Sequence, residues 1–343
     1  MSKVFLALSG GVDSSVALSF LKNEGHNVEA LCLKMSALHD KTLSAAEKAA
    51  AHLSVPLHIV NAEELFESVV VKNFAEEYLS GRTPNPCIVC NPAVKFRLLY
   101  DFAVKNGFDK IATGHYATIR NINGKNYIGV AANIKKDQSY MLYRLPSEII
   151  DRLIFPLGET KDKSVVRDAA VKENLPSAEN PDSQEICFIE NETYADFIER
   201  NFSKSKKGCF IGPKGEVLGE HKGIMHYTVG QRKGLSLSYS EPIYVKKIDS
   251  ESGNVFLCRS GEEYFSGVRL KGVFLPHPIE KTEFKANVKI RYSAKTSEAE
   301  IKLSGDTAEV IFKEPQRACC PGQSAVFYSG DIVIGGGFIS ENI

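Results

Sequence analysis

Two groups of residues in this chain of 343 residues have the types and spacing that chemistry requires. The first is a glycine-rich segment, LALSGGVDSS, at residues 6–15. Its adjacent glycines allow a tight turn that presents backbone N–H groups, and a helix starting there adds the positive end of its dipole. The hydroxyls of Ser9, Ser14 and Ser15 can donate to a phosphate, and Asp13 can help to hold Mg²⁺ against a polyphosphate. The lysine of the GxxxxGK[ST] loop is missing, so the segment predicts a phosphate-binding loop that differs from the loop of γ-phosphate-transferring enzymes.

The second group consists of three cysteines. Cys87 and Cys90 are separated by two residues in a proline-flanked turn at 83–91, ahead of an expected helix, and Cys187 stands in the segment DSQEICF at 182–188. Thiols close to a helix start are expected to have depressed pKa values. The chain has eight cysteines and shows no signal peptide. We therefore predict a reducing, cytoplasmic location, and candidate catalytic or metal-binding thiols rather than a disulfide framework.

The first 200 residues must supply the framework that positions these groups. Short apolar runs alternate there with amphipathic ones. Such alternation predicts an α/β fold with a doubly wound parallel sheet and right-handed crossovers. The glycine-rich segment would join the first strand to the first helix. Strands are expected at 3–8, 28–33, 57–60 and 110–113, and helices at 14–24, 43–53, 63–79 and 93–106.

The rest of the chain has a different pattern. Beyond about residue 202, short β-rich runs are separated by glycine and proline, which is typical of an all-β barrel or sandwich. A segment rich in lysine and glycine at 203–237 indicates a small region between the two halves. We predict three domains: an α/β domain at 1–202 that carries the glycine-rich segment and the three cysteines, a small central linking domain at 203–265, and a C-terminal β-barrel at 266–343.

Composition restricts the class of protein. The chain has 42 lysines and arginines and 42 aspartates and glutamates, so its formal net charge is zero, and bulk positive charge cannot hold nucleic acid. The net charge is −4 over residues 1–200 and +4 over residues 201–343, so the basic excess lies on the β half. No apolar run approaches the roughly 20 residues that span a bilayer, and we predict no membrane association.

Several motifs in order carry a resemblance to a known family. The SGGVDSS segment is the motif of the PP-loop ATP pyrophosphatases, which cleave ATP between the α and β phosphates. Along nearly the whole chain, the sequence resembles the tRNA-specific 2-thiouridylases. The six motifs are GRTPNPxxxCNxxxKF (81–96), ATGHYA (112–117), KDQSYxLY (136–143), DSxxICFI (182–189), YTVGQRKGL (227–235) and PGQSAVFY (321–328).

The resemblance implies an activity. The family adenylates the wobble uridine, position 34, of tRNA with ATP and replaces its O2 with sulfur, releasing AMP and pyrophosphate. The implied partners are the tRNAs for Glu, Gln and Lys and a cysteine desulfurase or another sulfur donor. Two alternatives stay open: a PP-loop synthetase that acts on a small molecule, and a non-catalytic Fe–S or tRNA-binding protein.

The resemblance also assigns roles to residues of this chain. Cys90 corresponds to the family nucleophile and Cys187 to the cysteine that carries persulfide sulfur. The positions that would bind ATP, with Mg²⁺, are Ala7, Leu8, Ser9, Gly10, Gly11, Val12, Asp13, Ser14, Leu33 and Gly114. The positions that would contact tRNA are Asn85, Pro86, Cys87, His115, Lys136, Asp137, Gln138, Arg291, Tyr292 and Gln323.

One position departs from the family pattern. Many members have aspartate where this chain has Cys87, so the role of that aspartate in positioning the base or moving a proton is in doubt. Cys87, Cys90 and Cys187 could together hold three irons of a [4Fe–4S] cluster and leave the fourth iron open to sulfide. A persulfide relay without metal is the main alternative, and a structural zinc site is a third.

Overall fold

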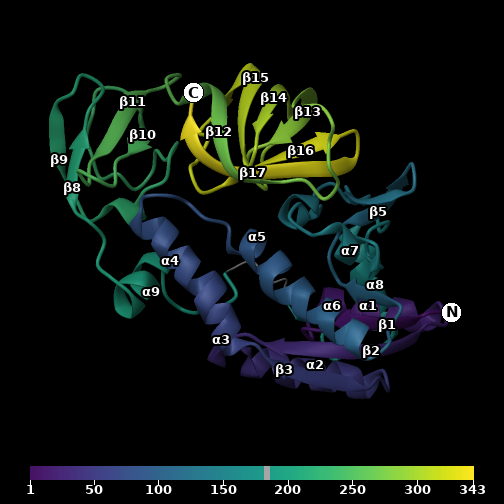
Figure 1. The fold of residues 1–343 in the computed structure, drawn as a ribbon. Helices are drawn as coiled ribbons and strands as arrows, with labels where there is room; N and C mark the ends of the chain where they lie inside the picture. Colours follow the sequence, from purple (N-terminus) through teal and green to yellow (C-terminus); the bar gives the residue numbers. More distant parts are fainter. Residues whose placement is uncertain (181–185) are drawn as a thin grey trace. The chain divides into compact units, whose positions relative to one another are not determined.

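The computed structural model describes residues 1–180 and 186–343, and it divides into two compact units (Figure 1). The first unit comprises Met1–Val70, Cys87–Glu190 and Gly330–Ile334. The second comprises Val71–Pro86, Asn191–Ser329 and Gly335–Ile343. In the described ranges, no helix is long and apolar enough to cross a membrane.

A parallel sheet forms the centre of the first unit. Leu6 in its middle strand pairs with Ala30 on one side and with Ala112 on the other, both in parallel register. Strands in this position are buried on both faces, which explains why their sequences are apolar throughout rather than alternating. The strand order is β3 (Leu57–Asn61), β2 (Asn27–Lys34), β1 (Lys3–Ala7), β4 (Lys110–Thr113) and β7 (Leu153–Ile154).

Helices cover both faces of this sheet, as the strand–helix alternation predicted. Val4 and Leu6 of β1 belong to a buried cluster that includes residues of α1 (Val12–Asn23), α2 (Asp40–His52) and α8 (Lys163–Lys172). Phe5, which points to the opposite face, stacks on Phe102 of α6 (Phe96–Lys105) with ring centroids 4.7 Å apart. The prediction of a doubly wound α/β fold is confirmed.

Two helices expected from the sequence are less regular than predicted, and the second of them is also longer. The one expected at 63–79 is built from α3 (Glu63–Phe66), a π-helical turn (Glu67–Val71) and α4 (Lys72–Leu79). The one expected at 93–106 begins earlier, with α5 (Pro86–Cys90) and a π-helical turn, η3 (Asn91–Lys95), ahead of α6. Proline suits the first position of a helix because its missing N–H would have no partner there. Cys87 and Cys90 therefore lie within a helix, and the prediction of a turn ahead of it is wrong.

Shorter elements complete the first unit. A hairpin of β5 (Thr118–Ile122) and β6 (Lys125–Gly129) turns at Asn123 and Gly124, which both have the positive φ that such two-residue turns require. The remaining elements are η1 (Ala37–His39), η4 (Ser139–Leu142) and α7 (Ser147–Ile150).

The second unit contains a small sheet with its own apolar core. The strand order is β10 (Ile243–Ile248), β11 (Val255–Arg259), β8 (Gly208–Ile211) and β9 (Val217–His221). Phe210, Val245 and Val255 are among the residues buried against it. β8 and β9 lie in the lysine- and glycine-rich segment for which no strands were predicted. The helices α9 (Tyr194–Asn201) and η5 (Ile224–His226) also belong to this unit.

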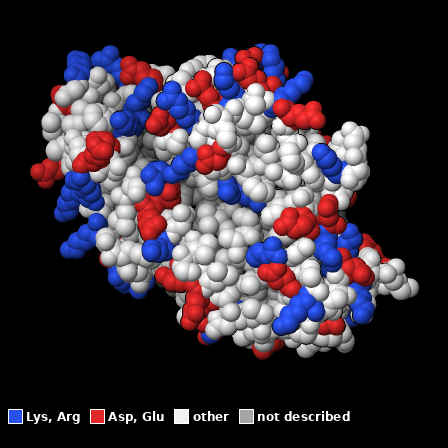
Figure 2. Space-filling model, in the orientation of Figure 1, with Lys and Arg blue, Asp and Glu red and all other residues white. Residues whose placement is uncertain are grey.

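A six-stranded antiparallel barrel follows in the chain. Pairing of its first strand with its last closes the barrel, so it has no free edge within this set of strands. This agrees with the prediction of a C-terminal β-barrel. Figure 2 shows both signs of charge interspersed over the visible face, as the zero net charge predicts. The strand order is β12 (Tyr264–Phe274), β15 (Thr307–Arg317), β14 (Ser297–Ser304), β13 (Glu283–Lys289), β16 (Ser324–Ser329) and β17 (Ile332–Asn342).

Candidate active site

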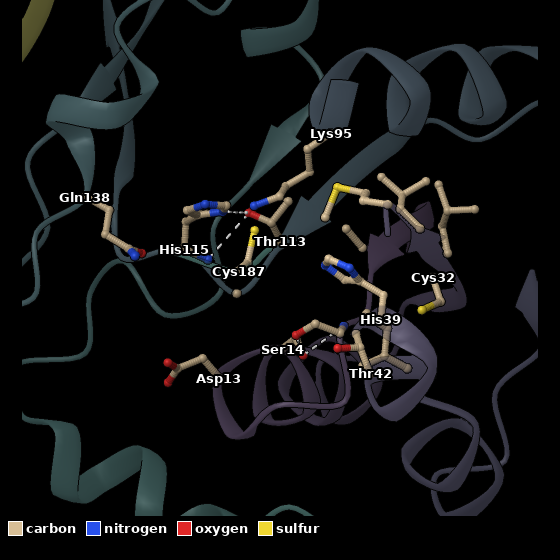
Figure 3. A pocket seen from close by; sticks show the side chains of 17 residues that line it. Asp13, Ser14, Cys32, His39, Thr42, Lys95, Thr113, His115, Gln138 and Cys187 are labelled. Atoms are coloured by element: carbon tan, nitrogen blue, oxygen red, sulfur yellow. Dashed lines mark hydrogen bonds between the residues drawn. The ribbon is translucent and has the colours of Figure 1, made fainter. Parts of the chain in front are cut away.

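A cavity of about 330 Å³ lies at the carboxyl ends of β1, β2 and β4 in the first unit (Figure 3). Open parallel sheets bind their ligands at this edge. Seven of the ten positions expected to bind ATP line it, and so do Cys187, His115 and Gln138. The full lining consists of Ala7, Leu8, Ser9, Asp13, Ser14, Leu31, Cys32, Leu33, Met35, His39, Thr42, Lys95, Thr113, Gly114, His115, Gln138 and Cys187.

The local geometry requires glycine at one position of the loop, Gly10, and at one position of the neighbouring strand end, Gly114. Gly10 has a φ of +72°, and a Cβ there would lie 2.3 Å from the backbone of Ala45 in α2. Gly114, at the end of β4, approaches the loop so closely that a Cβ would lie 2.8 Å from the backbone nitrogen of Ser14. Gly10, Gly11 and Val12 do not line the cavity themselves. Gly10 lets the turn pack on α2, and Gly114 lets β4 approach the loop.

The loop serines differ in their access to the cavity. The Ser14 hydroxyl donates to the carbonyl of Gly11 at 3.1 Å and lies 3.1 Å from the hydroxyl of Ser9. Both residues line the cavity, as expected of residues that bind phosphate. Ser15 is completely buried and does not line it. The prediction that Ser15 donates to phosphate is therefore wrong, because its position on α1 faces the core.

Two residues that the sequence did not identify hold Asp13. The phenolic hydroxyl of Tyr116 donates to the Asp13 carboxylate at 2.7 Å, and the ammonium of Lys163 forms an ion pair with it. Lys163 is the first residue of α8, which is capped by the Asp162 side chain. Because Lys163 lies 150 residues from Asp13 in sequence, spacing could not reveal the pair.

Two of the three candidate cysteines, Cys90 and Cys187, have thiols whose pKa values are raised by their surroundings. Burial is the largest influence on Cys90 and raises its pKa, and Cys87 raises it further. The charge of Lys95 and a hydrogen bond from the Lys95 backbone act in the opposite direction and lower it. Desolvation, followed by the charges of Cys87 and Cys90, raises the pKa of Cys187 to about 12, although this residue is exposed at the cavity. The expected depression of the Cys90 pKa is thus wrong, because burial outweighs the helix. Cys87 contributes to the raised pKa values of both Cys90 and Cys187, which indicates that the fold brings the three sulfurs near one another.

The described residues offer no ready metal site. In the ranges 1–180 and 186–343, no three His, Cys, Asp or Glu side chains are arranged to hold a metal ion. Residues 182–185 of the DSxxICFI motif lie outside the described residues. Cys87 and Cys90 do not line the cavity, whereas Cys187 does.

Besides Cys87, four positions expected to contact tRNA lie in the first unit, one just after β4 and three in a turn. His115 lies 2.8 Å from the Thr113 hydroxyl through Nδ1, and desolvation, aided by the charge of Lys95, holds its pKa well below the ordinary value. Asp137 is buried and accepts hydrogen bonds from the Ala131 and Ser139 backbone N–H groups, so its carboxylate holds a turn. That turn is the one that carries Lys136 and Gln138.

The remaining expected tRNA contacts lie in the second unit. Arg291 donates to the carbonyl of Val229 at 3.1 Å, and Gln323 donates to the carbonyl of Thr83 at 2.8 Å. Tyr292 is partly exposed, with the Lys289 ammonium 5.6 Å from its ring centre. Asn85 precedes α5, and Pro86 is its first residue.

The sequence matches three domain families in order. They are described as tRNA methyl transferase HUP domain (residues 2–191), tRNA methyl transferase PRC-barrel domain (195–259) and aminomethyltransferase beta-barrel domain (271–339). The tRNA-specific 2-thiouridylase MnmA of Pelobacter propionicus is 41% identical, with 99% of this chain and 98% of that protein covered. The enzyme of the same name from Acetivibrio thermocellus is 42% identical, with 98% and 99% covered.

The chain also has a distant likeness among solved structures. A 4-thiouridine synthetase, solved as an RNA complex with bound ATP, has 19% identity and a TM-score of 0.38. The match covers 58% of this chain and 49% of that one.

Proposed function

Because the chain belongs to the tRNA-specific 2-thiouridylase family, we propose that its cavity carries out both steps of uridine thiolation. The protein is a tRNA sulfurtransferase that uses ATP. We place the modified base at position 34, the wobble uridine, with O2 as the atom replaced. The observation that supports this proposal is the shared wall of the cavity, where the phosphate-loop residues Ser9 and Ser14 face the same space as Cys187.

The first step makes the oxygen on C2 a good leaving group. An amide-like carbonyl oxygen leaves poorly, whereas AMP leaves readily after adenylation. The loop hydroxyls of Ser9 and Ser14 would hold the phosphates, and Leu33 and Gly114 would border the nucleotide. The Asp13 carboxylate fits Mg²⁺, because it is an oxygen ligand that lines the cavity beside these hydroxyls. The metal would neutralise charge on the pyrophosphate that is released.

The second step transfers sulfur through two cysteines. The terminal sulfur of a Cys187 persulfide attacks C2 of the adenylated uridine and displaces AMP. The Cys90 thiolate then attacks the Cys187 sulfur, forms a Cys90–Cys187 disulfide, and leaves the bonding electron pair on the sulfur of 2-thiouridine. If Cys90 instead releases sulfide first, the products are the same. In either case an external thiol reductant must return two electrons to the disulfide before the next turnover.

We favour this relay over a cluster or a structural zinc. The donor set does not fit a metal in the described ranges, where no three potential ligands are grouped to hold one. No step of the mechanism is therefore assigned to iron or zinc. The persulfide sulfur would come from a cysteine desulfurase or another cytoplasmic donor, and the tRNAs would be those for Glu, Gln and Lys. The relatives do not favour a small-molecule synthetase or a non-catalytic binding protein.

The test is a reconstitution. Purified protein receives ATP, Mg²⁺, unmodified tRNA for Glu, a persulfide donor and a dithiol, and the tRNA nucleosides are measured by mass spectrometry. We expect 2-thiouridine at position 34 together with one AMP and one pyrophosphate per base modified. Unmodified uridine in the presence of a competent donor would refute the proposal.

A further inference from the structure

Among the described residues that line the cavity, one is a cation. This residue is Lys95, and the one carboxylate in the same described lining is Asp13, which Lys163 and Tyr116 already hold. Figure 3 shows the Lys95 side chain pointing to the part of the cavity where His115 and Cys187 lie. The charge of Lys95 is therefore directed at His115 and Cys187 rather than at Asp13 of the phosphate loop.

The local backbone also places Lys95 close to Cys90. Lys95 is the last residue of the π-helical turn η3, which directly follows Cys90. Such wide turns in a helix are frequent at functional sites. This one is fixed by Asn91, which is buried and donates to the carbonyl of Met141 at 3.0 Å. The turn brings the backbone of Lys95 into a hydrogen bond with the Cys90 sulfur.

The charge of Lys95 acts on four titratable groups, three of which line the cavity, whereas the fourth, Cys90, does not. It lowers the pKa values of Cys90 and Cys187, and it also lowers those of His115 and His39. Burial and the neighbouring thiols, including Cys87, act in the opposite direction and raise the pKa values of Cys90 and Cys187. Neutral histidines do not compete for an anion, so Lys95 is the cation that the described lining presents to the sulfurs.

We propose that Lys95 is a positioning residue of the sulfur-transfer step, whose ammonium stabilises the anionic sulfur on Cys90 and on Cys187. The inference rests on the proposed function, since it assigns the sulfur chemistry to these two cysteines. A buried thiol that stays protonated is a poor nucleophile. A fixed cation beside it offsets burial without reacting itself. In this proposal Lys95 acts on the sulfurs, and the loop between β1 and α1 binds the phosphates.

The experiment compares Lys95→Met, Lys95→Arg and the control Lys105→Met, which alters an exposed lysine at the end of α6. Three quantities are measured: tRNA-dependent pyrophosphate release, 2-thiouridine formation, and the iodoacetamide alkylation rates of Cys90 and Cys187 at pH 7.5, determined by peptide mass spectrometry. Thermal unfolding identifies any variant that does not fold. Lys95→Gln replaces Lys95→Met in that case.

In Lys95→Met we expect alkylation of the two cysteines to slow by roughly tenfold, which corresponds to a change of one pKa unit. We expect 2-thiouridine formation to fall by at least as much, while pyrophosphate release stays within about threefold. Lys95→Arg should recover most of the loss, and the control should match the wild-type protein. Unchanged alkylation overturns the proposal, and so does an equal loss of pyrophosphate release, which would assign Lys95 to the phosphates. A failure of the proposed function would appear differently, as wild-type protein that forms no 2-thiouridine.

Discussion

The close packing of the phosphate loop on α2 can be tested by replacing three glycines, one at a time, with alanine. Gly10 combines a positive φ with a site where a Cβ would lie 2.3 Å from the backbone of Ala45 in α2. Gly25 has a positive φ of +81° and no atom within 4 Å of an added Cβ. Gly11 has extended backbone, and its nearest contact would be the Ser9 hydroxyl at 3.5 Å. Alanine at these positions therefore separates backbone strain from steric overlap.

The expected costs follow from these differences. Gly25→Ala carries the strain of a left-handed residue alone, about 1–2 kcal/mol. Gly10→Ala carries that strain and the cost of forcing apart a packed contact, together about 2–5 kcal/mol. Gly11→Ala should cost less than about 1 kcal/mol, the loss of a small residue that begins a helix. The order Gly10, Gly25, Gly11 is the prediction.

Two measurements check this order. Urea denaturation followed by circular dichroism gives the free energy of unfolding, and hydrogen exchange of the α2 amides reports whether Ala45 and its neighbours have shifted. In Gly10→Ala we expect faster exchange in α2 and reduced protection by ATP. If Gly10→Ala is as stable as Gly11→Ala and leaves α2 exchange unchanged, the packing of the loop on α2 is not as described.

Three further predictions concern the site. Cys90→Ser should abolish 2-thiouridine formation while tRNA-dependent pyrophosphate release continues; full activity of this variant would contradict its role as nucleophile. Asp13→Asn should raise the Mg²⁺ concentration for half-maximal pyrophosphate release by roughly tenfold or more, measured by titration, and an unchanged requirement would count against metal binding by Asp13. Because burial lowers the pKa of His115, its contribution to stability is fully present above the unfolded pKa of about 6.5 and is lost as the pH falls below it. Urea midpoints should therefore drop less between pH 7.5 and 5.5 in His115→Gln than in the wild-type protein, and an equal drop would refute this assignment.

The sequence was sufficient to predict the sheet and the loop, because both depend on local patterns. Apolar strands alternating with amphipathic helices predict a doubly wound sheet, and the adjacent glycines predict a tight turn after the first strand. Residues such as Ser9, Ser14 and Gly114 could therefore be expected at one edge of that sheet. Their lining of one cavity agrees with this expectation.

Features that depend on tertiary packing could not be predicted. The ionisation of Cys90 depends on how deeply α5 is buried, which no neighbouring residue reveals. Lys163 reaches Asp13 only because α8 packs on α1. The π-helical turn at 91–95 has no distinctive composition, so the position of Lys95 relative to Cys90 was not visible in the motif.

The path of the chain between the two units restricts how the protein can be assembled. The first unit is made of three separate stretches, and its last, Gly330–Ile334, is synthesised roughly 140 residues after Glu190. Ile332 in that stretch pairs with Gly129, so the first unit acquires its final strand contact only after most of the second unit has left the ribosome. Early in synthesis the nucleotide-binding fold would exist without this contact. Neither unit corresponds to a continuous fragment, so a single cut in the gene cannot separate adenylation from the rest of the molecule.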